Sequence, residues 1–146
     1  MALYLEDLHE GQTFASRAEE VTTDSIKAFA SQYDPQPFHL DETAAEGSFF
    51  GGLAASGWQT AAVTMRLLTE SVPLAGGVIG GGGEIRWPQA TRPGDRLTVE
   101  SRVEKIAASR SRPDRGMVTL RSETRNQRGE VVQILIATLL AFRRPE

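Results

Sequence analysis

The clearest pattern of apolar positions lies in the middle of the chain. Over residues 57–71, apolar side chains recur at three- and four-residue spacing, in the order Trp58, Ala61, Ala62, Met65 and Leu68. This spacing puts them on one side of a helix and predicts an amphipathic α-helix. Ser56 stands before it and Gln59 follows three residues later, which is the spacing of a capping box. We therefore expect a long helix with Ser56 as its N-cap and Gly57 as its first residue.

A two-residue period follows in the second half of the chain. Leu97, Val99 and Val103 alternate with polar residues, as in a strand with one buried face. Residues 131–142 are almost continuously apolar, which is typical of a central strand. Four strands are predicted, over residues 78–87, 96–107, 116–125 and 130–143. Because the connections between them are rich in turn residues, we expect these strands to form an antiparallel meander.

Two shorter helices are predicted before the long one. The polar residues 22–24 are suited to capping a helix that continues through residues 26–30. Asp41 can cap another short helix over residues 42–46, which would end near Gly47, since helices often stop at glycine.

The order of elements indicates the fold class. One long helix followed by antiparallel strands is typical of an α+β domain in which the sheet wraps the helix. With 146 residues and no internal repeat, the chain fits a single domain over residues 1–146. Such a sheet has a free edge, and pairing with a second copy is a common way to cover it. We therefore expect a homodimer.

Composition narrows the classes of partner. The 16 basic and 19 acidic residues are mixed along the chain and give a net charge of −3, which argues against nucleic acid as a partner. The absence of cysteine excludes disulfides and thiolate chemistry. The longest apolar stretch, over residues 134–142, is about half of the ~20 residues of a membrane helix. The N-terminus does not resemble a signal peptide. We expect a cytoplasmic protein that is not in the membrane.

The first candidate for chemistry is the pair Asp34 and His39. They lie five residues apart, and Pro35 and Pro37 predict a stiff loop over residues 33–39 that holds them over one cavity. A carboxylate and an imidazole in this arrangement can share a water molecule and act as general base and general acid. The alternative is purely structural: Asp34 organises the turn, and His39 caps the helix that starts near Asp41.

The second candidate is the start of the long helix. The amide of Gly57 would have no partner within the helix, and the lack of a side chain there would let a substrate oxygen approach. It is thus a candidate for half of an oxyanion hole. The alternative is that Ser56 and Gly57 only begin a buried helix.

The remaining candidate motifs give no site that we include in the prediction. The glycines over residues 76–83 are followed by a strand-like segment, whereas a phosphate-binding loop requires a helix there. We interpret them as a strand whose bare backbone either lets the long helix pack closely or opens a slot for a thin ligand. His9 has no second ligand at metal spacing, and no metal site is predicted. Several arginines were candidates for binding phosphates, but lone arginines are usually solvated, so none is included in the site: Arg86, Arg92, Arg96 and Arg102.

The segment over residues 29–41, with Asp34 and His39, together with residues 50–58, resembles the hydratase motif of the MaoC-like family, or (R)-specific enoyl-CoA hydratases. The likeness extends over about residues 8–142. It implies a hotdog fold, usually dimeric, with Asp34 and His39 catalytic and the amide of Gly57 polarising the thioester carbonyl. Ser56 and Trp58 would be substrate contacts next to it.

Two positions depart from the family pattern, since Gln36 stands in place of the usual Asn and Ser56 in place of the usual His. The family also often offers a serine to the catalytic Asp from further along the helix, and it is open whether Thr60 or Thr64 takes this role.

The resemblance implies hydration of a trans-2-enoyl-CoA, or a related thioester, to an (R)-3-hydroxyacyl product, with no cofactor beyond the CoA or acyl-carrier protein that carries the substrate. Two alternatives remain, a hotdog thioesterase that attacks the thioester carbon and a non-catalytic module that binds acyl-CoA. The first would release free CoA thiol, and the second would bind its ligand without turnover.

Overall fold

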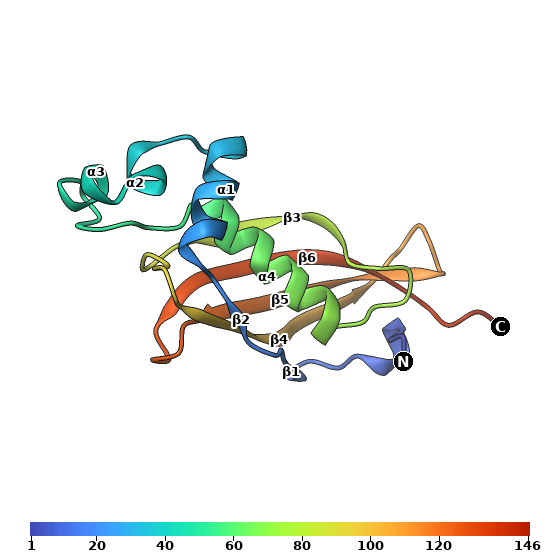
Figure 1. The fold of residues 1–146 in the computed structure, drawn as a ribbon. Helices are drawn as coiled ribbons and strands as arrows, with labels where there is room; N and C mark the ends of the chain where they lie inside the picture. The colour runs from blue at the N-terminus through green and yellow to red at the C-terminus, as the bar shows by residue number, and fades with distance from the viewer.

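An antiparallel sheet curves around one long helix in the computed structural model, which describes residues 1–146 (Figure 1). The helices are a short 3-10 turn η1 (Leu5–Asp7), α1 (Thr23–Tyr33), α2 (Pro37–Leu40), α3 (Glu42–Glu46) and α4 (Gly57–Ser71). The strands are β1 (Thr13–Ala15), β2 (Glu19–Glu20), β3 (Ile79–Arg86), β4 (Arg96–Ala108), β5 (Arg115–Arg125) and β6 (Val131–Phe142). The predicted α+β class and the helix wrapped by a sheet are thus confirmed.

The strand order corrects one prediction. The sheet runs β1-β4-β5-β6-β3, with the short β2 also on β4, and all pairs are antiparallel. Only β4, β5 and β6 form a meander, and the prediction that β3 belongs to it was wrong. A meander of all four strands would leave the continuously apolar β6 at an edge. Pairing β3 with the outer side of β6 makes β6 an interior strand instead.

The buried face of α4 is more polar than its apolar spacing suggested. Trp58 is 59% exposed and Met65 is 41% exposed, whereas Thr60 and Thr64 are buried against the sheet. Their hydroxyls are satisfied by hydrogen bonds to Thr91 (3.1 Å) and Thr124 (2.6 Å). Further along the helix, the packing is apolar, as a cluster around one end of the sheet shows: Leu5, Leu8, Leu68, Val72, Leu74, Val103, Val118, Leu120, Leu139 and Ala141.

The three short helices gather over one end of α4, as the upper left of Figure 1 shows. Thr22 caps α1 in a reciprocal capping box with Ser25, and Asp41 caps α3. The predicted loop over residues 33–39 is helical in its second half, because Pro37 occupies the first position of α2, where a missing N–H is harmless. A second apolar cluster lies beneath these helices: Val21, Ile26, Ala45, Leu53, Ala55, Leu97 and Val132.

The glycine-rich segment is a strand, as predicted. Its glycines, however, serve another purpose than close packing of the long helix. Gly82 has φ +139°, a conformation that favours glycine, and a bulge lies between Gly80 and Gly82. A Cβ at Gly83 would collide with the backbone of the neighbouring β6 at Ile136 and Ala137. The glycines therefore allow the strand to bulge and to lie close to β6, while α4 packs mainly against β4 and β6.

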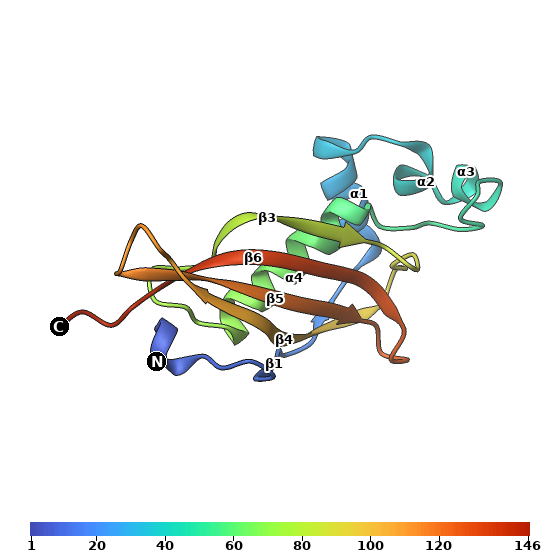
Figure 2. The ribbon, with the colours of Figure 1, turned by 180° about the vertical axis from the view of Figure 1, so that it is seen from behind.

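Two surfaces of the sheet are left open. Figure 2 shows the face opposite α4, which no helix covers, and β3 forms one edge of the sheet along its whole length. None of the helices combines the length and the apolar character needed to cross a membrane.

Candidate active site

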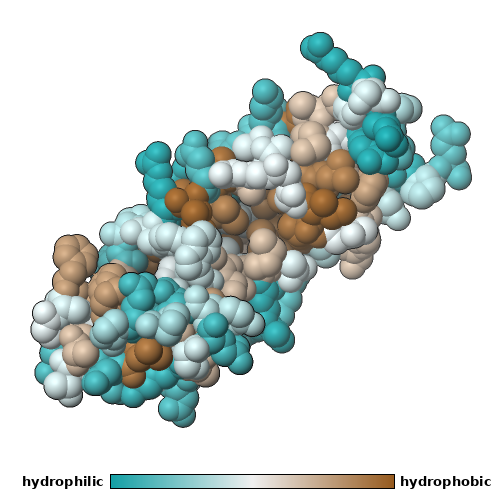
Figure 3. Space-filling view, turned by 90° about the horizontal axis from the view of Figure 1, so that it is seen from above, coloured by the Kyte–Doolittle hydropathy of each residue, from teal (hydrophilic) through white to brown (hydrophobic).

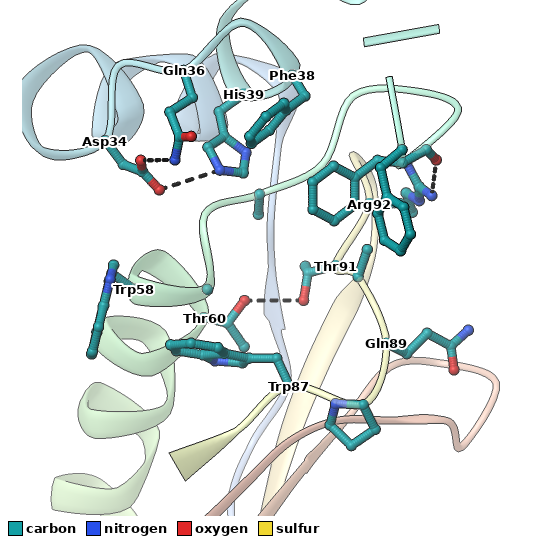
Figure 4. Close-up of a pocket in the computed structure, with 16 residues that line it drawn as sticks. Asp34, Gln36, Phe38, His39, Trp58, Thr60, Trp87, Gln89, Thr91 and Arg92 are labelled. Carbon is teal, nitrogen blue, oxygen red and sulfur yellow. Dashed lines mark hydrogen bonds and ion pairs between the residues drawn. The ribbon is translucent and has the colours of Figure 1, made fainter. Parts of the chain in front are cut away.

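A pocket of about 670 Å³ opens where the short helices, the start of α4 and the segment after β3 meet. Asp34 and His39 lie on one side of it, and Trp87 and Thr91 lie on the other (Figure 4). Gly57 and Trp58 also line the pocket, so the structure brings together four of the five predicted site residues. The fifth residue is Ser56, which was expected to contact a substrate. It is fully buried behind the pocket wall instead.

Asp34 is held by the end of a helix. It is the C-cap of α1, and its backbone amide still donates to the carbonyl of Ala30. Its Oδ2 accepts a hydrogen bond from the hydroxyl of Ser56 at 2.7 Å and lies 3.2 Å from Nε2 of His39. Its Oδ1 accepts from the side-chain amide of Gln36. The carboxylate is therefore fixed in position by three side chains.

His39 is oriented by a backbone carbonyl. Its side chain is only 5% exposed, and its Nδ1 lies 2.6 Å from the carbonyl oxygen of Ala54. Since a carbonyl can only accept, Nδ1 carries a proton, and Nε2 is left to face Asp34 and the pocket. The ring of Phe38 packs edge-on against the imidazole at 4.6 Å. The capping role considered for His39 is not observed, because Asp41 caps α3 itself.

Opposing effects act on the pKa of Asp34. Burial raises the pKa, but the hydrogen bonds from Ser56 and Gln36 and the nearby His39 lower it by more in sum. The net result is a pKa below the usual value of an aspartate. Asp34 is thus ionised at neutral pH and available as a proton acceptor.

Ser56 serves both the helix and the carboxylate. Its hydroxyl accepts from the amide of Trp58 at 3.2 Å while it donates to Asp34. The predicted capping box with Gln59 is wrong, because the hydroxyl of Ser56 accepts from the amide of Trp58 rather than that of Gln59, and the side-chain nitrogen of Gln59 donates to Ser25. The question of Thr60 or Thr64 is also settled, since both bond to other threonines and neither contacts Asp34. Ser56 itself is the hydroxyl partner of Asp34.

The amide of Gly57 is free. As the first residue of α4 it has no partner for its N–H, which makes no hydrogen bond within the chain. The positive end of the helix dipole also lies here. Gly57 lines the pocket together with Asp34 and His39, so an unpaired backbone donor lies at its wall.

Arg92 is a residue that the sequence analysis left out of the site. Its guanidinium donates to the carbonyl oxygens of Phe50, Gly52 and Leu53, which form the wall next to Ala54. Asp95 accepts the backbone N–H of Arg92 at 2.8 Å and fixes the turn. The sequence Arg-Pro-Gly-Asp over residues 92–95 is a signal for this turn, but nothing local reveals the partner of the side chain. The prediction that Arg92 is solvated was wrong.

Comparisons with known proteins agree with this geometry. The family model described as "MaoC like domain" matches residues 7–126. The uncharacterized protein YdeM of Bacillus subtilis is 31% identical over 126 residues, which cover 85% of this chain and 88% of YdeM. The crystal structure of a MaoC-like dehydratase from Rhodospirillum rubrum is 60% identical, with a TM-score of 0.98 over 99% of this chain and 100% of that one.

A more distant structure shows the same fold. The (R)-hydratase PhaJ1 from Pseudomonas aeruginosa, in its unliganded form, has a TM-score of 0.80 at 23% identity, over 98% of this chain and 88% of that one. The sheet wrapped on α4 is therefore the hotdog fold that the sequence motif implied. The family model covers most of the residues that build both the fold and the pocket, from the end of η1 through β5. The chain belongs to the family of MaoC-like domains.

Proposed function

We propose that this MaoC-like protein adds water to a trans-2-enoyl thioester to give an (R)-3-hydroxyacyl thioester, and that it also catalyses the reverse dehydration. The observation that carries the proposal is the contact of 3.2 Å between Asp34 Oδ2 and His39 Nε2 at the wall of a pocket that also exposes the free amide of Gly57. The likeness to MaoC-like dehydratases and to an (R)-hydratase supports it.

The amide of Gly57 would bind the thioester oxygen. Addition of water at C3 places negative charge on this oxygen, and a fixed donor at a helix start stabilises that charge. One such donor is typically worth about 10²–10³ in turnover. No further cofactor is part of the proposal, and CoA or acyl-carrier protein would serve only to carry the acyl group.

Asp34 and His39 would divide the proton transfers. The carboxylate of Asp34 takes a proton from water as the water oxygen bonds to C3, and His39, protonated on both nitrogens, gives the Nε2 proton to C2. Asp34 is then neutral and His39 has lost one proton. Because Oδ2 and Nε2 are in contact, the proton on Asp34 can return to His39 and restore the starting state.

A second copy of the chain would complete the molecule. The edge strand β3 is exposed along its length, with Ile79 44% exposed at its start. Figure 3 looks down on this side of the molecule and shows apolar side chains there. Unpaired strand edges of this kind are usually covered. We therefore propose a homodimer that pairs along β3.

The proposal is tested with Asp34→Asn and His39→Gln and an assay of the product. We expect each change to lower hydration of crotonyl-CoA by roughly 10²-fold or more, as is usual for a general acid or base. Both residues lie at a helix end or in a short helix, so circular dichroism should remain that of the unchanged protein.

The product distinguishes the alternatives. Intact 3-hydroxyacyl-CoA supports the proposal, whereas free CoA thiol would indicate a thioesterase. Tight binding of enoyl-CoA without turnover would indicate a binding module. Full hydration by both variants would remove Asp34 and His39 from the mechanism.

A further inference from the structure

Trp87 occupies an unusual place between α4 and the end of β3. A Cβ built on Gly57 would lie 2.7 to 3.0 Å from three ring atoms of Trp87, so the indole lies directly on the Cα of Gly57. Figure 4 shows this ring reaching from the strand to the start of the helix, across the side of the pocket opposite Asp34 and His39. The indole therefore forms a wall next to the free amide.

Two contacts hold the indole in place. Its Nε1–H donates to Oε1 of Gln133 at 2.9 Å, and Gln133 is fully buried on β6. The ring of Trp58 packs edge-on against it, with the centroids 5.1 Å apart. The remaining amide nitrogen of Gln133 has no partner, so the hydrogen bond to Trp87 is the only side-chain bond that this residue makes. Such a buried glutamine is costly, and the bond to the indole offsets part of that cost.

Beyond the indole, apolar residues of α4 and β6 next to the edge strand β3 are not fully buried. Leu135 and Ala137 lie on the same face of β6 as the buried Gln133 and Leu139, because the four residues follow one another at two-residue spacing, yet both are only partly buried. On the helix, Ala61 and Met65 follow Gly57 at four-residue spacing, and Met65 is 41% exposed. Within one chain these residues form an apolar seam, and none of them lines the pocket, which Trp87 bounds on this side. In the proposed homodimer, a partner paired along β3 would form the outer wall of the seam.

We infer that Trp87 limits the acyl group to short chains by closing the pocket before this seam. This inference rests on the proposed hydration reaction. An acyl chain whose thioester oxygen meets the Gly57 amide has the indole directly in its path toward the seam. A longer chain has to displace a ring that is anchored by Gln133 and by Trp58. Forcing extra methylenes into a filled space is unfavourable, and so longer substrates are rejected.

The test compares crotonyl-CoA with trans-2-octenoyl-CoA in the unchanged protein and in Trp87→Leu. In the unchanged protein, we expect kcat/KM for crotonyl-CoA to exceed that for octenoyl-CoA by roughly a hundredfold, which is within the range for discrimination by size. Trp87→Leu opens the seam, and this ratio should narrow by at least roughly tenfold. Tyr33→Leu is the matched control, because it removes an exposed aromatic ring that lies outside the pocket, and it should leave the ratio unchanged.

Gln133→Met is a second variant that does not depend on the stability of the first. It keeps the shape of the side chain and removes only the acceptor that anchors the indole, so the ratio should shift in the same direction by less. An unchanged protein that hydrates octenoyl-CoA as fast as crotonyl-CoA would overturn the inference. So would a ratio that stays the same in folded Trp87→Leu and in Gln133→Met.

Binding of saturated thioesters separates this inference from the proposed reaction. Titration calorimetry with butyryl-CoA and octanoyl-CoA reports chain-length preference without turnover. If no enoyl-CoA is hydrated but Trp87→Leu gains affinity for octanoyl-CoA, the pocket assignment holds and the hydration proposal fails. If crotonyl-CoA is hydrated but neither the activity ratio nor the binding changes in the variants, the inference about Trp87 fails alone. If neither thioester binds, both proposals fail.

Discussion

At the scale of single residues, Ser56 shows how one hydroxyl links the helix start to the candidate base. It accepts from the backbone of α4 and donates to Asp34, and it is fully buried between them. Gln36 supports the other carboxylate oxygen. Both positions depart from the usual family residues, and both donate a hydrogen bond to the carboxylate of Asp34, which lowers its pKa.

The first prediction at this scale concerns Ser56→Ala. The change removes a hydrogen bond that lowers the pKa of Asp34, so this pKa should rise. Since Asp34 must be ionised to accept a proton, the acid limb of the pH profile of kcat/KM should move to higher pH. Carbon-13 NMR titration of the Asp34 carboxyl should show the same direction. Loss of the N-cap should also lower the free energy of unfolding by about 1 kcal/mol.

The pH dependence of stability provides a check on the sign of this effect. A carboxyl group whose pKa is lower in the folded than in the unfolded protein stabilises the fold at pH values above its unfolded pKa. This stabilisation is lost as the pH falls through the folded pKa. Ser56→Ala should reduce this contribution of Asp34 to the free energy of unfolding.

Thr69→Ala is the control, because it removes an exposed hydroxyl near the other end of α4. It should leave the acid limb of the pH profile of kcat/KM where it was. An unmoved limb in Ser56→Ala would contradict the role given to Ser56.

At the scale of elements, the turn after β3 organises the pocket wall. The turn over residues 92–95 is joined to the strand before α1, because Gly94 donates to the carbonyl of Val21 and Val21 donates to that of Asp95. From this fixed turn, Arg92 reaches the carbonyls of residues 50–53, and the next carbonyl in that segment orients His39. Arg92 is therefore a positioning residue for the imidazole.

Arg92→Lys tests this arrangement. A lysine carries a single ammonium group in place of the planar fork that bonds several carbonyls at once, so the wall should loosen. We expect kcat to fall by roughly 10- to 100-fold with a smaller change in KM, because small displacements of a catalytic group are costly. The nitrogen-15 shifts of the His39 ring should change as its bond to Ala54 weakens.

The matched control is Arg96→Lys. This exposed arginine bonds through its backbone amide only, so activity and the His39 shifts should stay unchanged. A loss of activity in Arg92→Lys that leaves the His39 shifts untouched would mean that Arg92 acts on the substrate rather than on His39.

At the scale of the whole molecule, the two edges of the sheet differ. The strand at one edge, β1, is only three residues long, whereas β3 at the other edge runs from Ile79 to Arg86. Glycines 80–83 leave the backbone of this edge uncovered by side chains. The exposed backbone and the apolar residues near it make β3 the edge along which two copies would pair.

Ile79→Lys tests the proposed homodimer. A charged side chain on an edge strand disfavours pairing with another strand. Light scattering of the unchanged protein should give twice the 15.9 kDa of the chain, and the variant should shift toward the monomer. Thr13→Lys places the same charge on the opposite edge and should remain dimeric. A monomer at micromolar concentration before any substitution would exclude the proposed pairing.

Much of this protein is determined by residues that are near one another in the sequence. Apolar spacing and capping residues place α4 and α3, and two-residue alternation places β4, because local backbone preferences and burial of one face act over a few residues. The five-residue spacing of Asp34 and His39 also keeps these two side chains together, so the core of the candidate site could be predicted.

Only the tertiary structure decided the rest, since it depends on contacts between residues far apart in the chain. The pairing of β3 with β6 joins residues that are 48 (Arg86 and Ile134) to 61 (Ile79 and Leu140) positions apart, and the bond from Ser56 to Asp34 spans 22. Trp87 lies on Gly57 only because the end of β3 meets the start of α4. No local sequence pattern predicts these contacts. Local backbone preferences allow each of these segments several packing partners, and the packing of the whole chain selects one of them.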